Sequence, residues 1–201
     1  MSFRSLLSSR RAASLAFAPL MLAALSSTAS AHPGLPVGGF AGGLAHPFSG
    51  LDHMLAMVAV GLWAGQLGRP AQWLLPLLFP FVMTLGAVLG MNGVTLPWVE
   101  LGIAASVLVL GAVVAFSLKP SLVMSAALVA VFALLHGHSH GTELPQAASA
   151  LTYGAGFVAA TFVLHAIGLT LGAATGRPAG LVMRTAGATI AAVGAVLLVV
   201  G

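Results

Sequence analysis

Long apolar segments alternate with short polar breaks along most of the chain. The segments cover residues 49–67, 72–91, 97–117, 120–137, 147–174 and 179–200. Each is close to the roughly 20 residues that a helix needs to cross the hydrocarbon layer of a membrane. Proline, glycine or charged residues mark the breaks between them. The pattern predicts an all-α integral membrane protein, a bundle of six transmembrane helices.

The first 31 residues have the different pattern of a secretory signal peptide. Three arginines give a basic start, residues 12–25 form an apolar core, and Ala29-Ser30-Ala31 forms an A-x-A cleavage site. The alternative is an uncleaved first helix, but this core is short for a hydrocarbon layer of roughly 30 Å. We therefore expect residues 1–31 to be removed and residues 32–201 to form the mature membrane domain.

Composition supports a membrane protein and narrows its chemistry. Hydrophobic residues make up 59% of the chain and charged residues 5%, whereas soluble domains carry about 25% charged residues. The chain has no cysteine, which excludes disulfides and thiolate metal ligands. Its basic residues are few once the signal peptide is removed, so nothing indicates a nucleic-acid partner. A nucleotide-binding G-x-x-x-x-G-K-[ST] loop is also absent from the sequence.

The basic residues that remain predict the orientation in the membrane. Arg69, Lys119, Arg177 and Arg184 lie in or beside the first, third and fifth breaks, and the other breaks carry no lysine or arginine. Cytoplasmic loops are enriched in these residues. We therefore expect a multi-pass protein of the bacterial cytoplasmic (inner) membrane, with the mature N-terminus on the periplasmic side.

Two histidines and an aspartate stand at the start of the first apolar segment, in the stretch His46-Pro47-Phe48-Ser49-Gly50-Leu51-Asp52-His53. Placing an ionisable group in a membrane costs about 2–3 kcal/mol, so such residues are functional candidates. His46 and His53 share one face if a single helix runs through both. The alternative is a helix that starts at Ser49, with Asp52 serving only as part of its cap. Nitrogen and oxygen donors together favour a metal ion.

A second cluster occupies the break between the fourth and fifth apolar segments, which reads His136-Gly137-His138-Ser139-His140-Gly141-Thr142-Glu143. Imidazole binds nickel, zinc, copper and iron well, and carboxylate binds harder ions. The glycines would allow this loop to fold its donors toward one point. The alternative is a polar surface loop that binds metal only incidentally.

Three further residues are candidate ligands. Cleavage after Ala31 would expose His32 with a free amine. Glu100 lies near the start of the third segment. It is either a metal ligand or a carboxylate that caps the positive N-terminal end of the helix. His165 lies about 22 Å along the fifth helix at 1.5 Å per residue, where it is either a relay ligand or a packing residue. Most of the candidate ligands lie at the outer side of the membrane, and only His165 lies deeper. This arrangement indicates that an ion is captured outside and passes inward.

The sequence resembles the HupE/UreJ family of hydrogenase- and urease-associated membrane proteins, regarded as secondary nickel permeases. The resemblance rests on the His46-to-Trp63 motif, on Glu100-x-x-Ile103-Ala104-x-Ser106-Val107, on the His136-to-Pro145 segment and on His165. It covers the chain from His32 onward. The metal-handling positions that it implies are His46, Asp52, His53, His136, His140 and Glu143, followed by Glu100 and His165. Local chemistry adds His138 and His32.

The resemblance implies a permease, with no enzymatic activity, that imports Ni²⁺ or Co²⁺ for hydrogenase or urease maturation. Uptake should fall as pH drops through the imidazole range, because ligation requires unprotonated histidine. One alternative is an intramembrane hydrolase that uses zinc. Another is an accessory subunit that delivers metal without transporting it. The expected partners are the lipid bilayer, a divalent metal ion, and either a second copy of the chain or an accessory protein.

Overall fold

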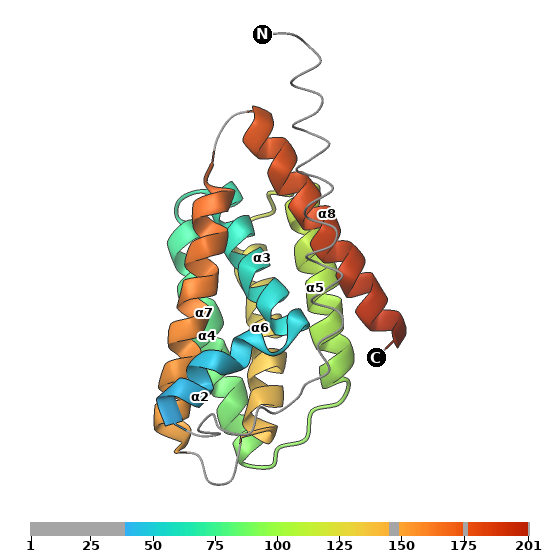
Figure 1. Ribbon diagram of the computed structural model, residues 1–201. Coiled ribbons are helices and arrows are strands. Elements are labelled where there is room, and N and C mark those ends of the chain that lie inside the picture. Colours follow the sequence, from blue (N-terminus) through green and yellow to red (C-terminus); the bar gives the residue numbers. More distant parts are fainter. Residues whose placement is uncertain (1–38, 145–148, 175–176, 201) are drawn as a thin grey trace. The chain divides into compact units, whose positions relative to one another are not determined.

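The computed structural model describes residues 39–144, 149–174 and 177–200, and all regular structure in these ranges is helical (Figure 1). The predicted signal peptide and His32 lie outside them. The elements are α2 (Gly39–Ala45), the short 3₁₀ helix η1 (His46–Phe48), α3 (Leu51–Leu67), α4 (Ala71–Met91), α5 (Val99–Ala115), α6 (Leu122–Thr142), α7 (Ala150–Gly172) and α8 (Arg177–Val200).

Each of the six predicted apolar segments carries one of the helices α3 to α8. Among the described residues, four helices are long and apolar enough to cross a membrane: α4, α6, α7 and the Gly180–Val200 part of α8. The stretch Gly39–Phe48 together with α3 forms a bent pair that would count as a fifth span. Helix α5 is also apolar but shorter, at 17 residues.

Helix α4 shows why these helices belong in a bilayer. Its inner face buries Leu75, Phe79 and Met83. Its outer face exposes large apolar side chains at every third or fourth position, namely Trp73, Leu77, Phe81, Leu85 and Val88. A helix that is apolar on all sides is stable where its outer face contacts lipid rather than water.

Helix α2 lies in a glycine-rich stretch ahead of the first predicted apolar segment, where the hydrophobic pattern predicts no helix. Glycine disfavours helices, but here it permits close contact with α7. A Cβ added at Gly43 would collide with the backbone oxygen of Tyr153, and one at Gly156 with that of Phe40. Packing against α7 therefore supports α2, which crosses the lower part of α7 in Figure 1.

The helices place acids and bases at opposite ends of the bundle. At one end Trp63 Nε1 donates to the Leu118 oxygen (2.9 Å) and Arg184 Nε donates to the Ala115 oxygen (3.1 Å). Arg69 and Lys119 lie in the breaks at this same end. The other end, where α3 and α5 begin and α6 ends, carries the carboxylates Asp52, Glu100 and Glu143. The candidate ligands gather at this acidic end.

Candidate metal centre

A sharp corner between η1 and α3 positions the first pair of histidines. The segments Gly39–Phe48 and Leu51–Leu67 are bent by 81° relative to each other. The expectation that one helix runs through His46 and His53 was therefore wrong. The alternative helix start at Ser49 was wrong as well, because α3 begins at Leu51 and the Ser49 hydroxyl donates to the His46 oxygen (2.6 Å). The corner directs both imidazoles toward α6.

Asp52 holds the ring of His53. Asp52 Oδ1 accepts hydrogen bonds from the backbone nitrogen of His53 (2.7 Å) and from its Nδ1 (2.8 Å). Because a carboxylate can only accept here, Nδ1 carries the ring proton and Nε2 keeps a free lone pair. A carboxylate behind a histidine is the usual second partner of a metal-binding imidazole.

His136 and His140 lie on helix α6, which continues to Thr142. The prediction of a flexible ligand loop was therefore wrong. The glycines in this stretch allow α6 to pack closely, since a Cβ at Gly137 would collide with the Met83 backbone. Residues four apart lie on the same helix face, so His136 and His140 point the same way through helix geometry rather than loop folding.

His138 does not join the other histidines. It is two residues from both His136 and His140, which places it about 200° around the helix, on the opposite face. Its Nε2 donates to the Val94 oxygen at 2.6 Å. His138 therefore ties α6 to the segment between α4 and α5, contrary to the expectation that all three histidines of this stretch share one site.

The remaining histidines form one connected group. The His53 ring centroid lies 4.7 Å from that of His136 and 4.2 Å from that of His140, and the His46 and His140 centroids are 4.9 Å apart. His46 Nε2 lies 4.0 Å from Glu143 Oε2. One donor atom each from His46, His140 and Glu143 lies within 4.8 Å of the other two, a spacing that could hold a metal ion. Two regions that are distant in sequence, residues 46–53 and residues 136–143, thus converge.

Several buried nitrogens in this group have no hydrogen-bond partner. They are Nε2 of His53, Nε2 of His136 and both ring nitrogens of His140, judged against the residues that the structure describes. The Nδ1 of His136 donates to the Phe132 oxygen (3.0 Å), so its Nε2 also bears a lone pair. An unsatisfied buried polar group costs about 1–3 kcal/mol. A ligand that accepts these lone pairs, such as a metal cation, would remove that cost.

A serine that the sequence analysis did not single out links two carboxylates beside the histidines. The buried Ser139 hydroxyl lies 3.1 Å from Glu143 Oε1 and 3.3 Å from Glu100 Oε1, and its single proton can serve either. The four-residue spacing of Ser139 and Glu143 was the only signal in the sequence. Glu100 and Asp52 both line a cavity of about 620 Å³ with Trp98 and neighbouring apolar residues, which makes this cavity acidic.

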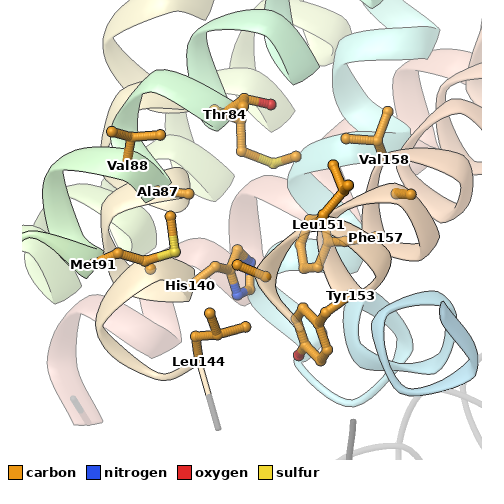
Figure 2. Close-up of a pocket in the computed structure, with 15 residues that line it drawn as sticks. Thr84, Ala87, Val88, Met91, His140, Leu144, Leu151, Tyr153, Phe157 and Val158 are labelled. Atoms are coloured by element: carbon orange, nitrogen blue, oxygen red, sulfur yellow. The ribbon is translucent and has the colours of Figure 1, made fainter. Parts of the chain in front are cut away.

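A second cavity, of about 350 Å³, is lined in part by His140 (Figure 2). Its walls come from α4, α6 and α7 and are mostly apolar; they include Met91, Leu144, Leu151 and Phe157. Tyr153, also unassigned by the sequence analysis, lines it and lies with its ring 5.8 Å from that of His46. Apolar walls exclude water from His140 and so strengthen its interaction with a cation.

His165 lies deeper in the bundle, apart from this group. It is 1% exposed, and its Nδ1 lies 3.3 Å from the Pro76 oxygen on α4. The Phe79 ring contacts both His165 and His136, with centroid distances of 5.2 and 5.8 Å. The structure thus groups six of the predicted ligands, with Glu100 linked to them through Ser139.

These features define a helical, multi-pass membrane protein with a cluster of mostly buried histidines and more exposed carboxylates at one end. The chain matches the family model described as HupE / UreJ protein over residues 20–197. It belongs to this family. Protein HupE of Rhizobium leguminosarum bv. viciae is 50% identical over 177 residues, which cover 88% of this chain and 93% of the relative. No solved structure matches the chain.

Proposed function

We propose that this protein is a secondary permease that admits Ni²⁺ from the periplasm for the maturation of a hydrogenase or urease. One observation carries the proposal: unpartnered imidazole nitrogens converge with a carboxylate at one end of an apolar helical bundle. The nickel assignment follows the HupE/UreJ resemblance, and the donors themselves also suit Co²⁺ and Zn²⁺.

The donor set suits a cation that must bind and then leave. His46, His140 and Glu143 would replace part of the water shell of the arriving ion, since their donor atoms lie within 4.8 Å of one another. His53 and His136 offer further nitrogens: His136 lies one turn before His140 on α6, and His53 contacts both. Conduction requires several sites of moderate strength rather than one tight site, and a group of neighbouring imidazoles provides this.

The acidic cavity supports entry at the same end. Asp52 and Glu100 line it, and negative charge in a cleft with low-dielectric walls concentrates cations. Asp52 also holds His53, so this carboxylate connects the cavity with the imidazole group. We assign the cavity as the entrance and the histidine group as the first binding site.

We further propose that α3 to α8 all cross the inner membrane after removal of residues 1–31, with the acidic end in the periplasm. Helix α5, with 17 residues, is about 26 Å long at 1.5 Å per residue, slightly less than the roughly 30 Å hydrocarbon layer. The bases Arg69, Lys119 and Arg184 at the opposite end support this orientation.

A zinc-dependent hydrolase is less well supported by the site. Such an enzyme needs an open coordination position where zinc activates a water molecule. The cavity that reaches His140 has mainly apolar walls, which suit dehydration of an ion better than hydration of a substrate. A metal-delivery subunit without transport would use the same ligands and is distinguished by experiment.

The test is uptake of radiolabelled Ni²⁺ by proteoliposomes that contain the purified protein. We expect accumulation by the wild type and its loss in His53→Ala and Asp52→Ala. His138→Gln is the matched control, because a glutamine amide can still donate to the Val94 oxygen. Uptake that is unchanged in both site variants would refute the proposal. Transport that appears only with a co-expressed protein would favour the delivery subunit.

A further inference from the structure

We propose that His165 is a second, inner ion-binding position and that Phe79 is the movable barrier between it and the outer histidine group. The inference rests on the proposed permease function and extends it to the path that the ion follows. Three independent features of α4 and α7 support it: the state of the His165 ring, the place of Phe79, and two prolines within α4.

The ring of His165 is held by a carbonyl that a proline leaves free. In a regular helix the Pro76 oxygen would accept from the nitrogen of residue 80, but residue 80 is a proline and has no N–H. His165 Nδ1 fills this position at 3.3 Å. Nδ1 must therefore carry the proton, and Nε2 is left buried with a lone pair and without a partner among the described residues.

This arrangement matches that of the outer histidines. His53 and His136 also donate through Nδ1, to Asp52 and to the Phe132 oxygen, and also leave Nε2 free and unpartnered. A hydrogen bond that fixes one ring nitrogen and frees the other is typical of metal-binding histidines. Thr161, fully buried one turn before His165, is a second polar residue at this depth.

Phe79 separates the two positions. Its side chain is fully buried, and its ring contacts His136 at a centroid distance of 5.8 Å and His165 at 5.2 Å. A phenyl ring has no lone pair with which to bind a divalent cation. We therefore assign Phe79 as the barrier that an ion displaces when it moves from the outer group to His165.

The backbone around Phe79 is suited to such a displacement. Pro76 and Pro80 lie within α4 on either side of Phe79, and each removes one backbone hydrogen bond from the helix ladder. The Pro80 oxygen in turn accepts from the Thr84 hydroxyl at 2.8 Å. The turn that carries Phe79 therefore has fewer backbone hydrogen bonds than the rest of α4. We expect this to let the Phe79 ring move while the helix remains packed.

The first experiment compares metal binding by purified full-length variants in detergent, with Co²⁺ as a spectroscopic probe in equilibrium dialysis. We expect two bound ions in the wild type and one in His165→Gln, with the outer-site affinity changed by less than about threefold because His165 supplies none of the outer donors. His165→Gln is chosen because its amide can still donate to the Pro76 oxygen. Equal stoichiometry in wild type and variant would overturn the inner position, whether or not the protein transports.

The second experiment tests the barrier by Ni²⁺ uptake in proteoliposomes. Phe79→Leu shortens the side chain and keeps it apolar, and Phe81→Leu, on the exposed face of the same helix, is the control. We expect Phe79→Leu to raise the initial uptake rate several-fold without changing Co²⁺ stoichiometry, because only the barrier is lowered. Rates that change no more than in Phe81→Leu would overturn the barrier. A wild type that binds two ions and transports none would instead contradict the permease function.

Discussion

Each of three buried histidines in this protein is fixed by one hydrogen bond at Nδ1. The acceptors differ: a carboxylate for His53, the oxygen of the preceding helical turn for His136, and a proline-freed oxygen for His165. The outcome is the same, an Nε2 lone pair held in a known direction. Preorganised donors lose little entropy when they bind an ion. Each of the three histidines can therefore accept an ion without first reorienting its ring.

Asp52→Asn tests whether the carboxylate behind His53 contributes to metal binding. The asparagine oxygen can still accept from Nδ1, but the negative charge that increases the basicity of the imidazole is lost. We expect metal affinity to fall about 10- to 100-fold, the range seen when such partners are removed. Calorimetric titration of the purified protein with Ni²⁺ measures it. An affinity equal to the wild type would show that Asp52 has no part in the site.

His136→Gln and His138→Gln form a matched pair, since both residues are buried on α6 and lie two positions apart. We expect His136→Gln to reduce Ni²⁺ affinity strongly, because it removes an Nε2 donor from the group. His138→Gln should retain wild-type affinity, because His138 lies on the opposite face. Titration of both variants checks this. Equal losses in the two would support a flexible loop in place of the helix.

The sequence identified most residues of the site but not their neighbours. Ionisable residues are conspicuous in an apolar chain, so His46, Asp52 and His53 could be recognised from the sequence alone. Ser139 and Phe79 are ordinary residues of membrane helices, and only their distances to the histidines and carboxylates reveal a role. Which of the three α6 histidines point inward could be decided only once the helix was known to continue through them.

Helix α2 and the end of α6 show how packing decides local structure. Helix α2 is rich in glycine and the end of α6 in glycine and histidine, residues with modest or poor helix propensity, so the sequence pattern predicts no helix in either stretch. The same glycines allow α2 to approach α7, and α6 to approach α4. The favourable contacts form only in the folded protein, so propensity along the chain could not predict either helix.

Two glycines of α7 test how α2 is anchored. A Cβ at Gly156 would collide with the backbone of α2 at Phe40, whereas a Cβ at Gly154 meets nothing within 4 Å. We expect Gly156→Ala to lower the melting temperature in detergent and to weaken Ni²⁺ binding, because a displaced α2 carries His46 away from His140. Gly154→Ala should leave binding unchanged and raise the melting temperature slightly, since alanine favours helix by up to about 1 kcal/mol. Identical behaviour of the two variants would contradict the anchoring.

The bundle as a unit has an acidic end that holds the ligands and a basic end. Hydrophobic segment length predicted where helices α3 to α8 lie, because apolar length is strongly constrained in membrane proteins, although only four of the described helices are long enough to span by themselves. The pairing of α4 with α6, α5 with α8, and α3 with α7 depends on side-chain fit between helices. That fit is not readable from hydropathy, although the regularly spaced glycines indicate close contacts.

Single-cysteine variants can report the orientation of the protein in the membrane, because the natural chain has no cysteine that would react as well. Asn92 lies between α4 and α5 at the acidic end, and Lys119 lies between α5 and α6 at the basic end; both are exposed. We expect a membrane-impermeant thiol reagent to label Asn92→Cys in spheroplasts, and Lys119→Cys only after permeabilisation. The reverse pattern would place the histidine group on the cytoplasmic side and contradict inward transport from the periplasm.

X-ray absorption spectroscopy at the nickel edge of the purified, Ni²⁺-loaded protein identifies the atoms that coordinate the ion. Donors from η1, α3 and α6 that meet at one ion should give a first shell of nitrogen and oxygen only, with the outer-shell scattering of at least two imidazoles. That signal should weaken in His140→Ala, because His140 contacts both His46 and His53. A shell of oxygen alone, unchanged by this substitution, would contradict the convergence of histidines on a metal ion.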